Sequence, residues 1–253
     1  MDKIVSAQFI INELLSIANS EKAEKFQYFF KTGKGQYAEG DIMLGIPVPF
    51  TRNVVKNCHI LPLSEILILL DSEYHEIRLS GFLLLVKQYK KADLIGKKEI
   101  FDFYIENAHK ANNWDLVDLT CKDIIGLYLS DKKDRNILYK LAENNNLWEQ
   151  RISIVSTWTF IKNNQFDDTL ALSEKLITHK HDLIHKAIGW MLREVGKKNK
   201  TVLVDFLEAN YKKLPRTALQ YSIEHFSPEE RAYYIKKQKV IKSQKNVQKR
   251  KIF

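Results

Sequence analysis

The segment WDLVDLTCKDIIGLYL, residues 114–129, decides the fold class. Its apolar residues recur three and four positions apart, which is the spacing of one face of an α-helix. On that helix Trp114 and Asp118 lie four residues apart and share a face. Two interpretations are open. Asp118 either interacts with the helix dipole from an N-terminal turn beside an edge-of-core tryptophan, or it is a functional carboxylate beside a π surface.

Three other segments resemble this one, namely EYHEIRLSGFLLLV (73–86), LWEQRISIVSTWTF (147–160) and HDLIHKAIGWMLRE (181–194). Each begins with polar residues, places one polar side chain about a turn inside, and then becomes apolar. These inner positions are Arg78, Asp118, Arg151 and His185, which are 40, 33 and 34 residues apart. Such periods are typical of HEAT- or TPR-like helix pairs, each buried against its neighbours. The sequence predicts an all-α superhelical solenoid of antiparallel helix pairs.

Equivalent positions of a solenoid align along one surface, so Asp118, Arg151 and His185 are expected to lie near one another on a shared face. Three tryptophans fall within five residues of this row: Trp114, Trp148 and Trp190. Arginine binds phosphate in a bidentate manner, and tryptophan offers a π face to a base, a sugar or a cation. The row therefore fits a binding cleft. An Asp118–Arg151 ion pair between repeats, with the tryptophans in the core, fits the spacing equally well.

Helical patterns continue along most of the chain, which has only 9 Gly and 5 Pro in 253 residues. The predicted helices are 3–19, 21–31, 51–58, 62–71, 74–91, 97–110, 114–128, 133–145, 147–163, 166–179, 181–197, 199–212, 215–224 and 227–238. The exception is KTGKGQYAEGDIMLGIPVPF, residues 31–50, which is rich in glycine and proline. It lacks the G-x-x-x-x-G-K-[ST] pattern of a nucleotide loop, so an irregular connector is predicted.

Charge is distributed unevenly along the chain. The 23 residues from Arg231 to Phe253 contain nine basic residues and no acid, whereas the remainder has 31 basic and 31 acidic residues. We predict one helical-repeat domain over residues 1–238 and a basic, flexible tail over 239–253. The tail either maintains solubility or attracts phosphate backbones without sequence preference.

The cellular location is predicted from what the sequence contains. Cys58 and Cys121 form no disulfide or metal framework, which is typical of a reduced compartment. The first twenty residues are too polar for a signal peptide, and no apolar run approaches a membrane span. The sequence predicts a cytoplasmic protein without a membrane partner. His179, His181 and His185 resemble the H-E-x-x-H zinc pattern, but Asp182 replaces its glutamate and no third ligand follows. Helix-face histidines are favoured over a metal site.

Five blocks resemble the AlkD-type DNA alkylation-repair glycosylases, which are built from HEAT-like repeats. The blocks occur in the same order as in that family and lie within Phe26–Phe226: GDIMLGIPVP (40–49), NWDLVD (113–118), LWEQR (147–151), KAIGWMLRE (186–194) and LPRTALQYSIEHF (214–226). The resemblance implies a right-handed, C-shaped stack of helix pairs whose basic concave groove binds duplex DNA. It also implies hydrolysis of the N-glycosidic bond of cationic N7- and N3-alkylated purines, without a cofactor and by a monomer.

Residue roles implied by the resemblance are the following. The family's catalytic aspartate matches Asp118, and its tryptophans match Trp114 and Trp190. DNA-binding positions match Arg151, Arg193 and Phe29. A basic residue of some members is Thr159 in this chain, which weakens an expected backbone contact without affecting the chemistry.

Two further hypotheses from other functional classes remain open at this stage. One is a catalytically silent relative that binds distorted or branched DNA, and the other is a HEAT-type scaffold for a protein partner. The complete set of Trp114, Asp118, Arg151 and Trp190 favours the enzyme, because neither alternative requires a carboxylate that faces phosphates.

Overall fold

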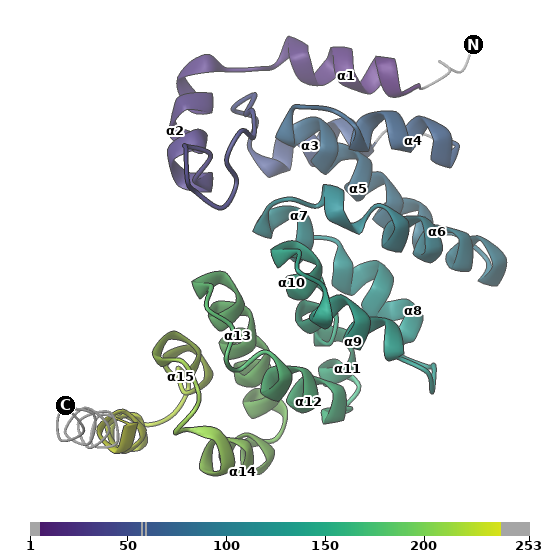
Figure 1. The fold of residues 1–253 in the computed structure, drawn as a ribbon. Helices are drawn as coiled ribbons and strands as arrows, with labels where there is room; N and C mark the ends of the chain where they lie inside the picture. The colour runs from purple at the N-terminus through teal and green to yellow at the C-terminus, as the bar shows by residue number, and fades with distance from the viewer. Residues whose placement is uncertain (1–5, 57, 59, 239–253) are drawn as a thin grey trace. The chain divides into compact units, whose positions relative to one another are not determined.

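The computed structural model of the protein describes residues 6–56, 58 and 60–238, and Figure 1 shows its helices. Every regular element in this part of the chain is helical, apart from one isolated parallel bridge between Ile42 and Tyr74. The predicted all-α class is confirmed. The predicted tail, residues 239–253, lies outside the described residues.

The chain divides into two compact units, Met1–Lys133 and Asp134–Phe253. Unit 1 contains α1 (Ala7–Ser16), α2 (Ser20–Phe30), α3 (Val48–Lys56), α4 (Leu63–Leu70), α5 (His75–Tyr89), α6 (Leu94–Glu106), η1 (Ala108–Lys110), α7 (Trp114–Asp118), η2 (Lys122–Gly126) and α8 (Leu127–Leu129). Unit 2 contains α9 (Asn136–Glu143), α10 (Leu147–Val155), α11 (Trp158–Lys162), α12 (Asp167–Lys175), α13 (Asp182–Lys198), α14 (Lys200–Asn210), α15 (Arg216–Ser222) and a helix over residues 228–238.

Helix α5 is the centre of unit 1. Fourteen of its fifteen residues are buried, because α1, α3, α4 and α6 all pack against it. Its sequence explains this position, since the apolar run Phe82–Val86 leaves no polar face, and a helix that is apolar on all sides is typical of a buried element. Only the first two turns of α5 carry several ionisable residues, and they lie next to α7.

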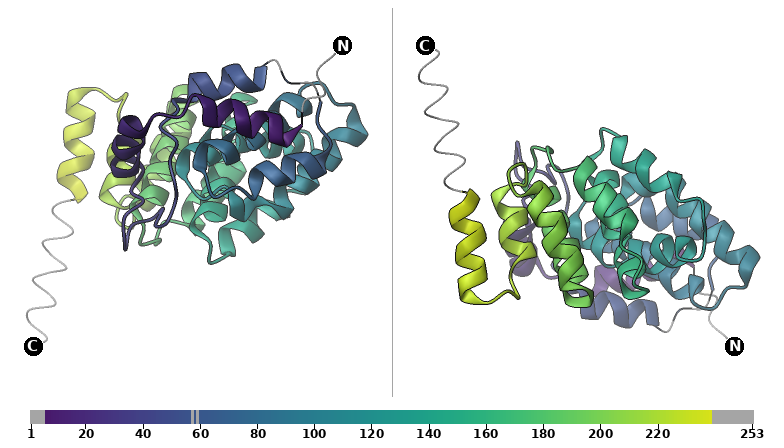
Figure 2. Two further views of the ribbon diagram at one scale, coloured as in Figure 1. Left: turned by 90° about the horizontal axis from the view of Figure 1, so that it is seen from above. Right: turned by 90° about the horizontal axis from the view of Figure 1, so that it is seen from below.

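Helix α13 has the corresponding role in unit 2, where α10, α14 and α15 pack against it. Gly189 permits the close approach of α15, because a Cβ atom added there would lie 2.5 Å from Tyr221 Cβ and 2.7 Å from Ala218 O. The helix over residues 228–238 follows α15 along the chain (Figure 2). It is held by Gln238, whose Nε2 donates to Tyr211 O at 3.2 Å and to Leu214 O at 2.8 Å.

Several helices begin where the sequence supplies a side chain that can accept a hydrogen bond from the first turn. Asn19 caps α2, Asp93 caps α6, Asn146 caps α10 and Asn199 caps α14, each through a backbone N–H two or three residues ahead. Helix α3 begins at Val48, three residues before the predicted start, because Pro49 is tolerated in a first turn.

Two helices predicted as continuous are interrupted. The predicted 114–128 helix ends at Asp118 and resumes as the π-helix η2, followed by α8. At this break Thr120 Oγ1 donates to Leu116 O at 2.5 Å and hydrogen bonds to the Tyr104 hydroxyl at 2.8 Å, and such side-chain bonds to a preceding carbonyl bend helices. The predicted 147–163 helix is likewise divided into α10 and α11, where Thr157 Oγ1 donates to Ile154 O at 2.7 Å.

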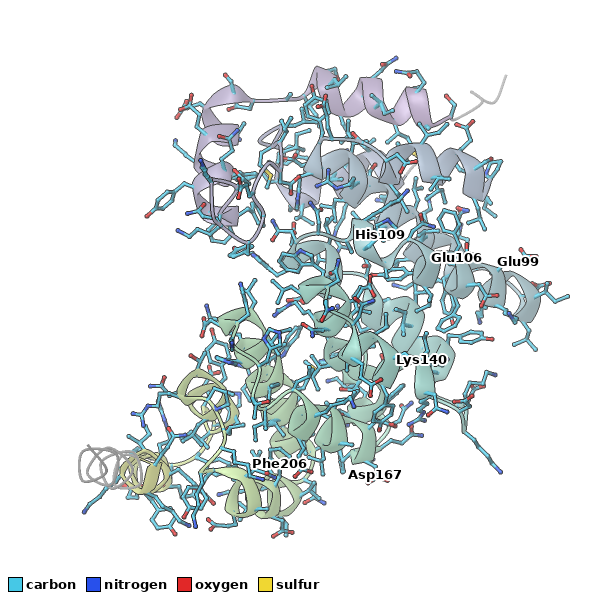
Figure 3. All side chains as sticks on the ribbon, viewed as in Figure 1. Glu99, Glu106, His109, Lys140, Asp167 and Phe206 are labelled. Carbon is cyan, nitrogen blue, oxygen red and sulfur yellow. The ribbon has the colours of Figure 1, made fainter. Side chains whose placement is uncertain are left out.

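Charged residues cover the outward sides of the helices. Glu99 and Glu106 lie one heptad apart on α6, Lys140 lies on α9 and Asp167 begins α12, and all four are exposed (Figure 3). None of the helices in the described ranges is long and apolar enough to cross a bilayer.

Candidate functional site

The predicted site residues are divided between the two units. Phe29, Trp114 and Asp118 belong to unit 1, where Trp114 begins α7 and Asp118 ends it. Arg151 lies on α10, and Trp190 and Arg193 lie on α13, all in unit 2. An arrangement of the two groups around one substrate stays a prediction.

In unit 1 the structure brings Phe29 and Trp114, 85 residues apart, into contact. The ring centroids of Phe29 and Trp114 are 5.8 Å apart in an edge-to-face arrangement. Trp114 also stacks on Phe30, with centroids 5.4 Å apart and planes inclined by 28°. Phe30 is buried, whereas 59% of Phe29 is exposed. A buried ring therefore supports Trp114 from behind, and an exposed ring extends the aromatic surface towards solvent.

A buried charged network lies behind these rings, and no pattern in the sequence indicates it. His75 hydrogen bonds through Nδ1 to Asp41 Oδ2 at 3.0 Å and through Nε2 to Asp115 Oδ2 at 2.9 Å. Arg78 forms an ion pair with Asp41 and donates through Nη2 to Asn112 Oδ1 at 2.9 Å. We call Asp41, His75, Arg78 and Asp115 the buried network. The four are at least nine-tenths buried, and two cations balance two carboxylates.

The network fixes the charge of its members. Burial by itself lowers the pKa of His75, but the carboxylates of Asp115 and Asp41 outweigh this effect and raise it to about 9. Burial likewise favours neutral Asp41, yet its hydrogen bond to His75 and the Arg78 guanidinium hold the pKa of that carboxyl below its usual range. At neutral pH the histidine is therefore an imidazolium ion that donates to both carboxylates. Because Asp115 lies in the first turn of α7, this bond sets the position of Trp114.

Glu76, the next residue of α5, holds the glycine-rich connector. Its carboxylate accepts the backbone N–H groups of Leu44, Gly45 and Ile46 at 2.8, 2.9 and 3.0 Å. Gly45 has φ +77°, and a Cβ atom there would lie 2.3 Å from Asn19 O, so this position requires glycine. The predicted irregular connector is confirmed over residues 41–46. Its role is to cover the start of α5 and to remove water from the buried network.

A cavity of about 630 Å³ lies between α2, the connector and the start of α5. Its wall is mainly apolar and aromatic, with Phe26, Phe29 and Phe30 among its members. Its acidic and basic members are Lys25, His75, Glu76 and Asp115. The aromatic face next to Trp114 is therefore adjacent to a space that can take an uncharged, flat or bulky group.

Asp118 is half-buried at the last residue of α7. The acid in the first turn is Asp115, whose Oδ1 accepts the N–H of Leu116 at 2.9 Å. The interpretation of Asp118 as an N-terminal dipole partner is therefore wrong, because the favourable end of the helix is occupied by Asp115. Lys122 Nζ donates to the Asp118 carbonyl at 2.5 Å, which places a cation one turn beyond the carboxylate.

In unit 2, Arg151 is buried, and its Nη1 donates to Leu183 O at 2.5 Å in the first turn of α13. Trp148, which the sequence placed in the same row, is 6% exposed and belongs to the core. Of the two interpretations left open by the sequence, cleft or core, the core is therefore the correct one for Trp148. Trp190 is half-buried on α13. Arg193 forms ion pairs with Glu224 and Glu194. Thr159, where some relatives carry a cation, is buried.

The three histidines before and within α13 bond to protein groups. His179 Nε2 hydrogen bonds to Gln150 Oε1 at 2.9 Å, His181 Nδ1 accepts the N–H of Leu183 at 3.1 Å, and His185 Nε2 bonds to His179 O at 2.5 Å. Burial, followed by the neighbouring imidazoles, lowers the pKa of His179 and of His181. In the described part of the chain, no group of three or more His, Cys, Asp or Glu residues could hold a metal ion.

The sequence profile of a family described as DNA alkylation repair enzymes matches residues 10–226, most of the chain. The chain belongs to the DNA alkylation repair enzyme family. Membership implies DNA as a binding partner and repair of alkylation damage as the process. No curated protein sequence matches this chain.

Two solved structures are similar in fold. One is a "predicted DNA alkylation repair enzyme" from Enterococcus faecalis, with a TM-score of 0.65 and 19% identity over 83% of this chain and 97% of that chain. The other is smu.31 from Streptococcus mutans UA159, with a TM-score of 0.51 and 16% identity over 88% of this chain and 98% of that chain. At these identities the likeness shows the fold alone.

Proposed function

We propose that the protein is a DNA glycosylase that hydrolyses the N-glycosidic bond of positively charged N7- and N3-alkylated purines in duplex DNA. Family membership supports the DNA and the damage class. The observation that carries the proposal is the construction of α7. One five-residue helix bears both Trp114 and Asp118, and its first turn is held by the His75–Asp115 bond and by the Phe30 ring.

The chemistry needs few groups. A cationic alkylpurine is already a good leaving group, so no general acid has to protonate it. The remaining barrier lies in the positive charge that develops on the deoxyribose. A carboxylate at Asp118 and the π faces of Trp114 and Trp190 stabilise such a charge, most strongly where water is excluded. Asp118 also orients or deprotonates the attacking water, so that water is the only co-reactant.

Binding to DNA in this proposal uses Arg151, Arg193 and Phe29. Arg151 is a positioning group, because its bond to Leu183 O fixes the guanidinium relative to α13. Arg193 exchanges Glu224 for a phosphate, and both partners of the present ion pair are at least partly exposed. Phe29 presents an exposed ring beside Trp114, where a base or sugar can stack.

The decisive experiment compares Asp118→Asn with wild type in the release of 7-methylguanine from methylated duplex DNA under single-turnover conditions. The substitution keeps the shape and removes the charge that faces the developing cation. We expect the rate to fall by about 10²–10³-fold, with DNA affinity unchanged or slightly higher. Asp123→Asn, the same change on η2, is the matched control and retains the wild-type rate.

Two outcomes contradict the proposal. If Asp118→Asn excises as fast as wild type, the carboxylate has no part in catalysis. If neither protein excises while both bind DNA, the chain is a catalytically silent relative that uses the same residues for binding.

A further inference from the structure

A second feature of unit 1, apart from α7, is a surface cavity of about 390 Å³ between α3 and the C-terminal end of α5. Its floor is formed by Val55, Leu83 and Val86, which are buried. The rest of its lining is cationic and consists of Arg52, Lys56, Lys87, Lys90 and Lys91. None of the described residues that line it is acidic. We call these eight residues the basic pocket.

The cations of the basic pocket differ from several lysines on other surfaces, which are paired with acids. Elsewhere the described lysines frequently pair with acids, as Lys98 does with Asp102 and Lys175 with Glu143. Among the described residues, no acid forms an ion pair with Arg52, Lys56, Lys90 or Lys91. Four mutually repelling charges are thus held around one small space without an intramolecular counterion. That arrangement favours an external anion.

Lys87 is the exception within the pocket, because its ammonium group bonds to backbone carbonyls of the protein. Its Nζ donates to the carbonyls of Val55, Lys56 and Cys58 at 3.0, 2.6 and 2.6 Å, at the C-terminal end of α3. These carbonyls carry the partial negative charge of the helix dipole. Because Lys87 neutralises them, the helix end does not cancel the field of the other four cations.

We propose that the basic pocket binds the sugar–phosphate backbone of DNA at a second position on unit 1, with phosphates on the cationic rim and deoxyribose on the apolar floor. The inference rests on the proposed function only for the identity of the ligand. Helix α5 joins the two places, since His75 begins it and Lys90 directly follows its end. Fifteen residues span about 20 Å, or roughly six base pairs. The pocket therefore lies about 20 Å from α7, at the opposite end of α5.

The test is the salt dependence of binding to an undamaged duplex, measured by fluorescence anisotropy between about 50 and 200 mM salt. Arg52→Ala/Lys90→Ala removes one exposed cation from each wall and leaves Lys87 and the fold untouched. We expect weaker binding and a plot of log K against log salt that is shallower by roughly 1.8, or 0.9 per lost phosphate contact. Arg52→Lys/Lys90→Arg, which retains both charges, keeps the wild-type slope.

Lys98→Ala/Lys140→Ala is the matched control, because it removes the same charge from exposed positions of α6 and α9. A pocket variant whose slope equals that of this control overturns the proposal. The DNA assignment is also overturned if the variant loses binding of inorganic pyrophosphate while its DNA slope is unchanged.

Excision distinguishes this proposal from the glycosylase proposal. A wild-type protein that releases 7-methylguanine while the pocket variant shows no slope change overturns the pocket alone. A slope change without any excision supports the pocket and overturns the glycosylase.

Discussion

The first turns of α5 and α13 occupy corresponding places in the two units, yet they are built differently. In α5, His75, Glu76 and Arg78 are buried under the connector, and every charge has a charged or backbone partner. In α13, the same stretch contains His181, Asp182 and His185, which are half-buried or exposed. The connector that covers α5 comes from between α2 and α3, whereas α13 is preceded directly by residues 176–181, which follow α12.

The comparison shows that the first turn of an α-helix can take on a structural role in one unit and not in the other, depending on whether another segment buries it. Ion pairs in water contribute little, whereas removing one partner of a buried pair leaves an uncompensated charge. The connector therefore converts ordinary first-turn polar residues into determinants of the position of α7. In α13 the corresponding residues stay exchangeable, because solvent can replace each partner.

The largest expected difference in stability is between the variants that remove the imidazole of His75 at α5 and that of His181 at α13. His75→Ala leaves Asp41 and Asp115 buried without their shared donor and is expected to lower the unfolding free energy by about 3–5 kcal/mol. His181→Ala removes a helix cap at a half-buried position and is expected to cost about 1 kcal/mol. Urea unfolding of both variants measures the difference. If both variants lost the same unfolding free energy, burial under the connector would not make the His75 interactions stronger than those of His181.

The pH dependence of stability is expected to have opposite signs in the two regions. The pKa of His75 is raised from 6.5 to about 9, so its contribution is fully present below pH 6.5 and is lost as the pH rises towards 9. By linkage this loss is on the order of 3 kcal/mol. The lowered pKa values of His179 and His181 act the other way, and their contribution is lost as the pH falls below 6.5.

Urea unfolding as a function of pH tests both signs. The alkaline loss should be absent in His75→Gln, and the acidic loss should be smaller in a His179→Gln/His181→Gln variant. An alkaline loss of the same size in His75→Gln would assign it to another group.

A smaller difference in stability is expected between variants of Glu76 and Asp182, the acids that follow His75 and His181. Glu76→Gln places an NH₂ group against backbone N–H donors of the connector and is expected to cost about 2 kcal/mol. Asp182→Asn, at an exposed position bonded to Lys186 and Thr217, should change stability by less than about 1 kcal/mol. Thermal melting compares the two. Protection of the Leu44, Gly45 and Ile46 amides from hydrogen exchange should fall only in Glu76→Gln.

Much of the helical architecture could be predicted, because it depends on local spacing. The starts of α5, α7, α10 and α13 follow from the change between polar and apolar residues, and each inner polar residue does fall at the fourth or fifth position of its helix. The contacts between side chains of different helices and loops could not be predicted from local spacing. His75 meets Asp41 and Asp115 across 34 and 40 residues, and no local pattern marks those partners.

The candidate site was likewise predictable where local sequence was sufficient and unpredictable where the partners are distant in sequence. Phe29 and Trp114 were named through the family resemblance, and the structure brings the two rings into contact. For Trp148 the sequence left a cleft position and a core position open, because a tryptophan beside an apolar run has the same pattern in both cases, and the structure places it in the core. At the interruption after Asp118, Thr120 bonds both to Leu116 O and to the Tyr104 hydroxyl of α6, and no periodicity can reveal the second partner.

Several hydrogen bonds between neighbouring helix pairs join residues that are about 30 to 40 positions apart in the sequence. Gln150 to His179, Arg151 to Leu183, Asp182 to Thr217 and His75 to Asp115 span 29, 32, 35 and 40 residues. Contacts of this range close only short loops, so the conformational search for each is small and the folding rate should be high for a chain of this length. Such a chain can also open one helix pair at a time, beginning at residues 228–238, whose attachment to the body includes Gln238 and the Lys237–Glu208 pair.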